Sequence, residues 1–379
     1  DNATLDITRS LNAWLDNSDN RWIAAGTYRR LYIYDVNSAL FDITPVGLTA
    51  GTETSIDATA FGGGVYGSDG YGEPRLERST GNPATTWSLD TFGQNLVACS
   101  TSDGKIYQWT LNTSTKAAQV TNAPVGNTGI MVTDERFLFA LGAASNPRKV
   151  QWCDRENNTL WTPAATNEAG SIELQTVGRI QCGVKVQNQA LILTTTDAHT
   201  ATYSGPPYVY GIERVGTSCG IVSAQGVAVV DMGAVWMGKE SFFMYSGGTV
   251  KELECDVADY LYSDINVSQM AKVVAVSNAK FSEIRWFYPS DDNTENNRYV
   301  SFNYQENTWT IGQLARTAGV DAGVYRYPIY FDPTNKKIYE HEVGFNYDNL
   351  IPFAESGPIM IGSGENIASI TQLIPDERN

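Results

Sequence analysis

Short apolar or aromatic runs, separated by polar turns, recur along most of the chain, and this pattern predicts β-strands. The runs are rich in β-branched and aromatic residues, and turns of Asn, Asp, Ser, Gly and Pro separate them. Two runs joined by such a turn form a β-hairpin. Seven hairpins are predicted, at 21–36, 95–111, 136–154, 189–205, 233–247, 283–305 and 328–344. Helical periodicity is nearly absent, and a segment such as "DVADYLYSDI" (256–265) is expected to be a connection.

The hairpins recur at a nearly constant interval. Their turns lie 41 to 54 residues apart, except for a first interval of 75. This is close to the length of a four-stranded propeller blade, about 40–50 residues. A Gly-containing apolar run precedes several hairpins and a short segment follows them, which gives four strands per unit. We therefore expect an all-β fold, a β-propeller of about seven four-stranded blades, or six if the terminal blades are incomplete.

The long first interval predicts an insertion at about 51–86, between the first two blades. The propeller is expected to span residues 1–346. Residues 347–379 are expected to form a C-terminal extension that leads toward a domain outside this sequence. Because the sequence opens on Asp1 with no initiator Met, we expect a gene product that is longer at both ends.

Large aromatic and sulfur-containing side chains are expected to pack in the interior. Five tryptophans lie in the predicted hairpins and should occupy the inner two strands, filling the space between blades: Trp22, Trp109, Trp152, Trp236 and Trp286. The five cysteines show no C-x-x-C spacing, and their number is odd. We expect buried free thiols, typical of a reducing cytoplasm.

The charge balance is acidic, with 26 basic and 42 acidic residues and a net charge of −16. A surface of this sign repels phosphate, which disfavours tight binding to nucleic acid or to anionic membranes. The longest apolar runs, such as "GVAVVDMGAVWMG" (226–238), are too short and too interrupted to cross a bilayer.

The segment "FGGGVYGSDGYG" (61–72) contains a G-x-G-x-x-G at Gly62, Gly64 and Gly67. A dinucleotide-binding fingerprint needs a strand before it and a helix after it, whereas Gly- and Pro-rich sequence follows here. The match therefore reflects composition. The more specific interpretation is a loop that contacts another subunit through the side chains of Tyr66, Tyr71 and Arg75.

Few residues suit metal binding or catalysis. The two histidines, His199 and His341, lie in different units, so we expect no zinc or iron site and no cofactor. The acidic loops at 16–20 and 291–296 lack the spacing of a calcium-binding loop and are expected to be solvated turns. A glycosidase would need two facing carboxylates. The candidate carboxylates are spread over several blades: Asp231, Glu240, Glu283, Glu306 and Glu340. We therefore expect no enzymatic activity.

From about residue 178 to 312 the blades share a particular order of aromatic and Gly residues. A strand ends at Tyr203, a Gly220–Ile221 step leads to an apolar strand, and a hairpin carries Tyr245 before a Gly pair at 247–248. A closing unit pairs Tyr304 with Trp309. This order resembles that of the packaged-DNA stabilisation, or tail hub (nozzle), proteins of short-tailed bacteriophages, and the opening stretch resembles the first blade of related phage and prophage structural proteins.

The resemblance implies a structural protein of the virion tail, made in the host cytoplasm. Copies of it, commonly six, would form a ring that extends the tail conduit below the portal and adaptor. The ring would also contact tail-fibre or needle proteins. DNA would pass through transiently, helped by acidic walls, and no membrane binding is expected. The alternative is a glycan-binding or glycan-cleaving, sialidase-like propeller. The candidate partner contacts are Tyr66, Tyr71, Arg75, Tyr208, Tyr210 and Phe353.

Overall fold

The computed structural model describes residues 3–60, 75–344 and 355. The chain divides into a propeller unit, Asp1–Glu342, and a second unit, Val343–Asn379, of which residues 343, 344 and 355 are described. The propeller unit thus ends at residue 342, where the sequence pattern placed the boundary at 346.

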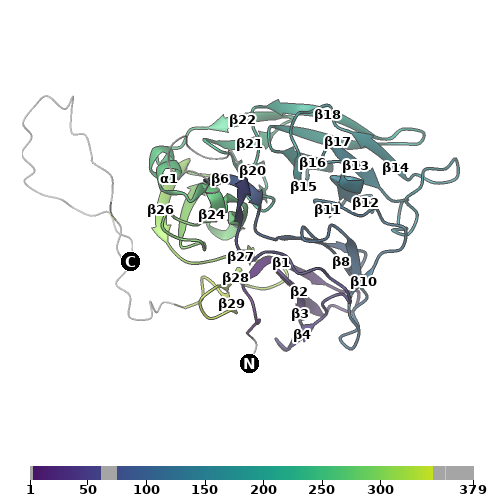
Figure 1. The fold of residues 1–379 in the computed structure, drawn as a ribbon, viewed down its shortest axis with the longest axis horizontal. Coiled ribbons are helices and arrows are strands. Elements are labelled where there is room, and N and C mark those ends of the chain that lie inside the picture. Colours follow the sequence, from purple (N-terminus) through teal and green to yellow (C-terminus); the bar gives the residue numbers. More distant parts are fainter. Residues whose placement is uncertain (1–2, 61–74, 345–354, 356–379) are drawn as a thin grey trace, which may run out of the picture. The chain divides into compact units, whose positions relative to one another are not determined.

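Seven antiparallel sheets follow one another along the chain and form a ring, so the predicted β-propeller is confirmed (Figure 1). Six blades have four strands and the seventh has three. Blades 1 to 3 are β1 (Thr8–Leu15), β2 (Arg21–Thr27), β3 (Leu31–Tyr34), β4 (Leu40–Asp42); β7 (Trp87–Phe92), β8 (Asn95–Ser100), β9 (Ile106–Trp109), β10 (Ala118–Gln119); and β11 (Gly129–Val132), β12 (Leu138–Leu141), β13 (Lys149–Trp152), β14 (Gly170–Glu173).

The remaining blades complete the circle. Blades 4 to 7 are β15 (Ile180–Val186), β16 (Gln189–Thr194), β17 (Asp197–Gly205), β18 (Val209–Thr217); β19 (Val227–Val230), β20 (Gly233–Met237), β21 (Phe242–Ser246), β22 (Thr249–Leu253); β23 (Val274–Asn278), β24 (Glu283–Tyr288), β25 (Arg298–Asn303), β26 (Thr308–Gln313); and β27 (Ala318–Val320), β28 (Ile329–Asp332), β29 (Lys337–Glu340). Short helices lie in the connections: η1 (Ala143–Ser145), α1 (Ala258–Asp264), η2 (Val267–Lys272) and η3 (Ala279–Phe281).

Each predicted hairpin forms the second and third strands of one blade. These middle strands are the most buried, which is why their hydrophobic pattern is the clearest. The five tryptophans lie on these two inner strands of their four-stranded units, as expected: Trp22 on β2, Trp109 on β9, Trp152 on β13, Trp236 on β20 and Trp286 on β24. All except Trp22 are buried in the packed core.

Aromatic side chains fill the interfaces between blades. Trp286 of β24 lies with its ring centroid 4.8 Å from that of Phe242 in the preceding blade. Trp87 of β7 packs on β2, where a Cβ at Gly26 would come within 2.5 Å of the Trp87 ring. A glycine at position 26 therefore lets the indole lie directly on the backbone of blade 1.

The ring closes between the last and the first blade. Strand β27 packs beside β1, and the hydroxyl of Thr317 donates to the carbonyl of Thr8 over 2.7 Å. The amide of Thr4 donates to the carbonyl of Lys336 over 3.0 Å, beside the β28–β29 turn. These contacts join the two ends of the propeller unit.

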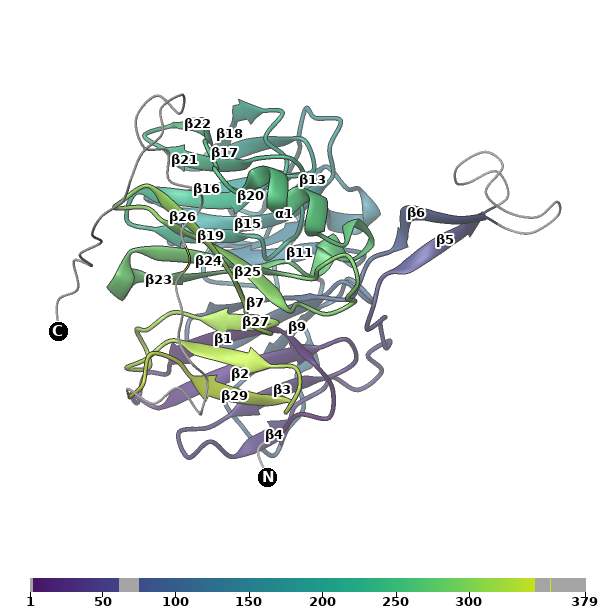
Figure 2. The ribbon, with the colours of Figure 1, turned by 90° about the vertical axis from the view of Figure 1, so that its left-hand side faces the viewer.

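An extra hairpin lies between two consecutive blades of the ring. Strands β5 (Ile56–Ala60) and β6 (Arg75–Asn82) pair with each other between blades 1 and 2, within the predicted insertion at 51–86. The hairpin projects away from the blades (Figure 2). Gly62, Gly64 and Gly67 lie outside the described residues.

The five cysteines are free thiols, and four of them are buried, as the sequence predicted: Cys99, Cys153, Cys182 and Cys219. Burial raises the pKa of Cys182 to about 12, so its thiol stays protonated near neutral pH.

Candidate functional site

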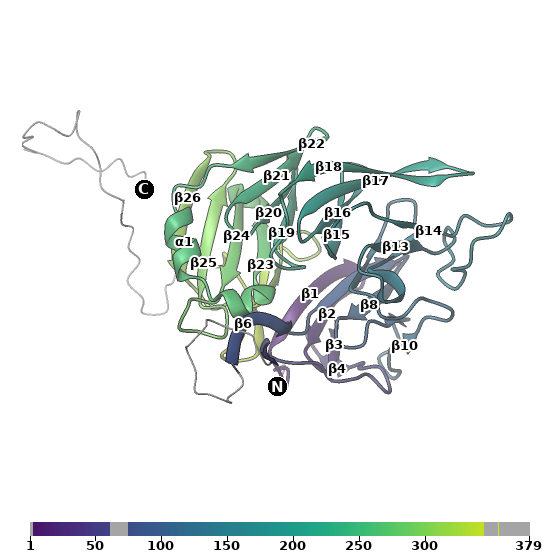
Figure 3. The same ribbon diagram turned by 45° about the horizontal axis from the view of Figure 1, so that its top comes forward.

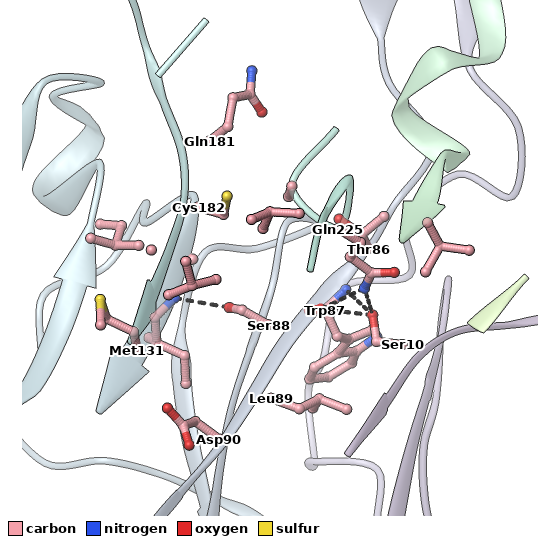
Figure 4. Close-up of a pocket in the computed structure, with 18 of the residues that line it drawn as sticks. Ser10, Thr86, Trp87, Ser88, Leu89, Asp90, Met131, Gln181, Cys182 and Gln225 are labelled. Carbon is pink, nitrogen blue, oxygen red and sulfur yellow. Dashed lines mark hydrogen bonds between the residues drawn. The ribbon is translucent and has the colours of Figure 1, made fainter. Parts of the chain in front are cut away.

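The axis of the ring is a channel of about 410 Å³, lined by the first strands of all seven blades (Figure 4). First strands run in the same direction along the axis, so each blade contributes side chains at every level. The lining combines aliphatic residues with a few polar ones, among them Ser88, Asp90, Gln181 and Lys185. The channel is large enough for a small molecule or several waters.

The polar groups of β7 are engaged by the neighbouring strand. The hydroxyl of Ser88 accepts from the amide of Ile130 over 2.9 Å, and Asp90 Oδ2 accepts from the amide of Val132 over 2.8 Å. Burial raises the pKa of Asp90, and the positive charge of Lys185 opposes this shift. These side chains therefore supply the hydrogen bonds that the edge of β11 lacks, which assigns them a structural role.

Gln225 crosses one end of the channel from the connection between blades 4 and 5. Its side-chain amide donates to the Ser10 hydroxyl and, over 3.2 Å, to the Trp87 carbonyl (Figure 4). One glutamine thereby links blade 5 with blades 1 and 2 across the axis.

A buried ion network lies beside this end of the channel. Arg9 of β1 makes two hydrogen bonds to Glu295 in the β24–β25 loop, with Nη1 to Oε2 at 2.5 Å and Nη2 to Oε1 at 2.7 Å. Lys272 Nζ donates to the same Oε1 over 2.7 Å. The Arg9 and Lys272 side chains are 2% and 0% exposed, and both bind the Glu295 carboxylate directly, while Glu53 adds a weaker electrostatic effect at Lys272.

The pKa values follow from this arrangement. Burial, with the positive charge of Arg9, lowers the pKa of Lys272 to about 8, although Glu295 opposes the shift. Burial alone would raise the pKa of Glu295. The hydrogen bonds and charges of Arg9 and Lys272 outweigh burial and lower it.

The same network fastens the base of the projecting hairpin. Arg9 Nη2 donates to the carbonyl of Glu53 over 2.9 Å. Gln269 of η2 is 4% exposed and binds the backbone of Ser55 in both directions, at 3.1 and 3.3 Å. The Ser55 hydroxyl accepts from the amide of Ala84 over 3.1 Å, which joins the two ends of the insertion. The sequence gives no local sign of these contacts, because their partners lie far apart in the chain.

The two histidines both contact other side chains of the propeller unit, His199 within a blade and His341 just after the last strand. His199 is buried in β17, with Nε2 3.3 Å from Asp197 Oδ1, and burial lowers its pKa despite that carboxylate. His341 Nε2 accepts from Arg316 Nε over 3.0 Å, beside the ring of Tyr330. Burial and then the charges of Arg316 and Arg285 lower the pKa of His341 to about 4.

We expect His341 to make the propeller less stable in acid. Its folded-state pKa lies below the unfolded value, so its contribution is complete above about pH 6.5 and is lost as the pH falls toward 4. Because the ring is partly exposed, solvent screening keeps the loss near pH 4.5 to roughly 1–2 kcal/mol. His341→Gln keeps an acceptor for Arg316. Urea unfolding at pH 7.5 and 4.5 should show a smaller acid loss for this variant, and an unchanged loss would contradict the assignment.

The predicted partner contacts fall into three groups. Tyr66, Tyr71 and Phe353 lie outside the described residues, and Arg75 is described only as part of strand β6. Tyr208 is 82% exposed at the tip of the β17–β18 hairpin, which extends beyond its blade (Figure 3). The expectation that Tyr210 is exposed is wrong.

Tyr210 is 5% exposed and packs edge-on against Phe139 and Trp152. Its hydroxyl bonds Thr133 at 2.9 Å and Glu135 at 3.1 Å. Tyr210 therefore belongs to the interface between blades 3 and 4 and is no longer a candidate partner contact.

The candidate catalytic carboxylates do not line the channel. They lie on blades 5, 6 and 7, and within blade 5 Asp231 precedes β20 whereas Glu240 follows it. Asp16 in the acidic loop at 16–20 accepts four hydrogen bonds, and those from the side chains of Asn20 and Trp22 lower its pKa to about 2. In residues 3–60, 75–344 and 355 no group of three or more His, Cys, Asp or Glu side chains could hold a metal ion. None of the helices in these ranges is long and apolar enough to span a membrane.

Comparison with known proteins finds similarity of fold. No protein-family model matches the sequence, and neither does any curated protein. Among solved structures, virginiamycin B lyase from Staphylococcus aureus is similar with a TM-score of 0.52 and 8% identity, covering 88% of this chain and 93% of the lyase. The β-propeller domain of Cps50 (Swd1) from Myceliophteria thermophila is similar with a TM-score of 0.51 and 9% identity, covering 90% and 98%.

The likeness to the lyase corrects one expectation. We expected no enzymatic activity, but a protein that shares this fold over most of its length is an enzyme. That expectation is therefore withdrawn. At 8% identity the likeness shows the fold alone and does not transfer the lyase reaction to this chain.

Proposed function

We propose that the chain is a structural subunit of a bacteriophage tail, one copy of a ring that extends the tail conduit and guides the packaged genome. The observation that carries this proposal is the β5–β6 hairpin, which projects from the propeller (Figure 2). An isolated two-stranded hairpin is marginally stable in water, so a projecting one gains stability by packing on another chain. The order of aromatic and Gly residues, which resembles that of tail hub proteins, supports a tail ring as the kind of assembly.

The anchoring of the hairpin supports the same role. Gln269 and Arg9 hold the backbone at Ser55 and Glu53 through buried side chains, so the direction of the hairpin is fixed by the ring. Such preorganisation reduces the entropy lost when a projecting element binds a partner. The exposed ring of Tyr208 at the tip of β17–β18 supplies a second contact of the kind found in protein interfaces.

The proposal predicts that the hairpin is needed for assembly and not for folding. Residues 56–82 would be replaced by two glycines, a junction that the contact between Ser55 and Ala84 favours. Mass photometry and negative-stain electron microscopy of the full chain should show rings, whereas the shortened variant should remain monomeric with its thermal midpoint within a few degrees.

A matched variant controls for general loss of surface contacts. Tyr339→Ser alters an aromatic side chain that is 40% exposed on another blade and should leave assembly unchanged. Rings formed equally well by the shortened variant, or a wild-type chain that stays monomeric at all concentrations, would overturn the proposal. Retention of duplex DNA by the purified protein at physiological salt would count against transient passage of the genome.

A further inference from the structure

A groove of about 610 Å³ lies between blades 4 and 5, away from the axial channel. Its walls come from the β16–β17 turn at Thr195 and Thr196, the β18–β19 connection at 217–220 and the β20–β21 turn at 239–241. The outer strands β18 and β22 add Arg214 and Glu252. A volume of this size is within the range of sites that hold small molecules, about 300–1,000 Å³.

The groove collects charged side chains that do not neutralise one another. Arg214, Lys239, Glu240 and Glu252 all line it and are exposed. None of the four forms an ion pair or side-chain hydrogen bond with another residue of the described ranges, whereas most arginines in those ranges are paired with a carboxylate. Two cations and two carboxylates therefore keep their full hydrogen-bonding capacity for a ligand.

A fixed carboxylate adds an acceptor at the floor of the groove. Asp197 is 5% exposed, and the hydroxyls of Thr176 and Thr194 both donate to its Oδ1, from Thr176 over 2.8 Å. No described group donates to Oδ2. Because the threonines hold the carboxylate in one orientation, the second oxygen is preorganised to accept a hydrogen bond from the groove.

Apolar surface faces the same space. Phe243 of β21 is half-buried, with its ring centroid 6.1 Å from that of Trp236, and it lines the groove. Val177, on another wall, is 94% exposed. An aromatic face beside polar groups provides a surface for the C–H face of a pyranose ring, while the polar groups fix its orientation.

We propose that this groove binds an acidic sugar. Arg214 and Lys239 would bind the sugar carboxylate, since the guanidinium fork matches its geometry. The hydroxyls of the sugar would donate to Glu240, Glu252 and Asp197, and the ring would lie on Phe243. An acidic peptide fits less well, because its side chains carry no hydroxyl donors for the three carboxylates that line the same groove and no pyranose ring to lie on Phe243. This inference does not rest on the proposed ring.

Titration calorimetry of the full chain with trigalacturonate tests the proposal. Its fully methyl-esterified form is a neutral probe of nearly the same shape. Binding of trigalacturonate in the micromolar to low-millimolar range is expected, with at least tenfold weaker binding of the ester. Arg214→Gln and Phe243→Ala should each weaken trigalacturonate binding at least tenfold, whereas Arg326→Gln, an exposed arginine on blade 7, should not.

Other outcomes decide against the proposal. No heat with 10 mM trigalacturonate, equal binding of the ester, or unaltered binding by Arg214→Gln would each overturn it. Equal binding of a triglutamate peptide would show a general anion site and overturn it as well. Because Arg214 is exposed, its variant should fold normally, which circular dichroism would confirm before titration.

Discussion

Glu295→Gln is expected to destabilise the propeller by about 3–5 kcal/mol, because it removes the one carboxylate that pairs directly with both buried cations. Arg9 and Lys272 both bind the Glu295 carboxylate and are almost fully shielded from water. An amide keeps the size and one acceptor but removes the negative charge. Guanidinium unfolding followed by tryptophan fluorescence should show a much lower midpoint for the variant.

Glu306→Gln is the matched control for this change. Glu306 is exposed in the β25–β26 turn of the same blade and forms no ion pair with another described residue, so its variant should stay within about 0.5 kcal/mol of wild type. If Glu295→Gln unfolded at the same midpoint as the control, the network would contribute nothing to stability. A second effect is expected in limited proteolysis, since Arg9 also holds Glu53 at the hairpin base. Cleavage within the insertion should become faster.

Trp286→Ala is expected to lower the free energy of unfolding by about 3–5 kcal/mol. The indole is fully buried in β24, and its Nε1 donates to the carbonyl of Gly226 in blade 5 over 2.9 Å. Removing it opens a cavity between two blades and takes away one of the two donors to that carbonyl, which keeps its bond from the amide of Met237. Calorimetry would measure the change as a lower thermal midpoint.

Trp286→Phe separates the two contributions. Phenylalanine retains the aromatic packing against Phe242 and loses only the hydrogen bond and part of the volume, so a loss of roughly 1–2 kcal/mol is expected. Equal losses for Ala and Phe would mean that the hydrogen bond, and not the packing between blades, dominates at this position.

The sequence predicts local structure well where burial imposes a regular pattern. Most middle strands are short apolar runs, such as β12 and β20, that are buried along their whole length and joined by turn residues, so the seven hairpins could be predicted. Several outer strands are short and exposed, such as β10 at Ala118–Gln119, and carry almost no pattern. The sequence allowed for incomplete terminal blades, but it did not show that the seventh blade has three strands.

Long-range contacts could not be predicted from the sequence, because no local pattern of residues encodes them. Arg9 and Glu295 lie 286 positions apart, and Gln225 and Ser10 lie 215 apart. The burial of Tyr210 has a local backbone cause, which the usual alternation of strand residues between two faces does not predict. Val209 has a φ of 60°, which breaks the extended backbone, so Val209 and Tyr210 are both buried beside the exposed Tyr208. Strict alternation would have placed Tyr208 and Tyr210 on the same face.

The contact between β27 and β1 has a consequence for synthesis on the ribosome. Blade 1 is translated first, yet the strand that covers it, Ala318–Val320, emerges after more than three hundred residues have been added. Until then the nascent chain exposes apolar surface that invites aggregation. Elongation speed and chaperone supply should therefore govern the yield of folded protein more strongly than its final thermodynamic stability does.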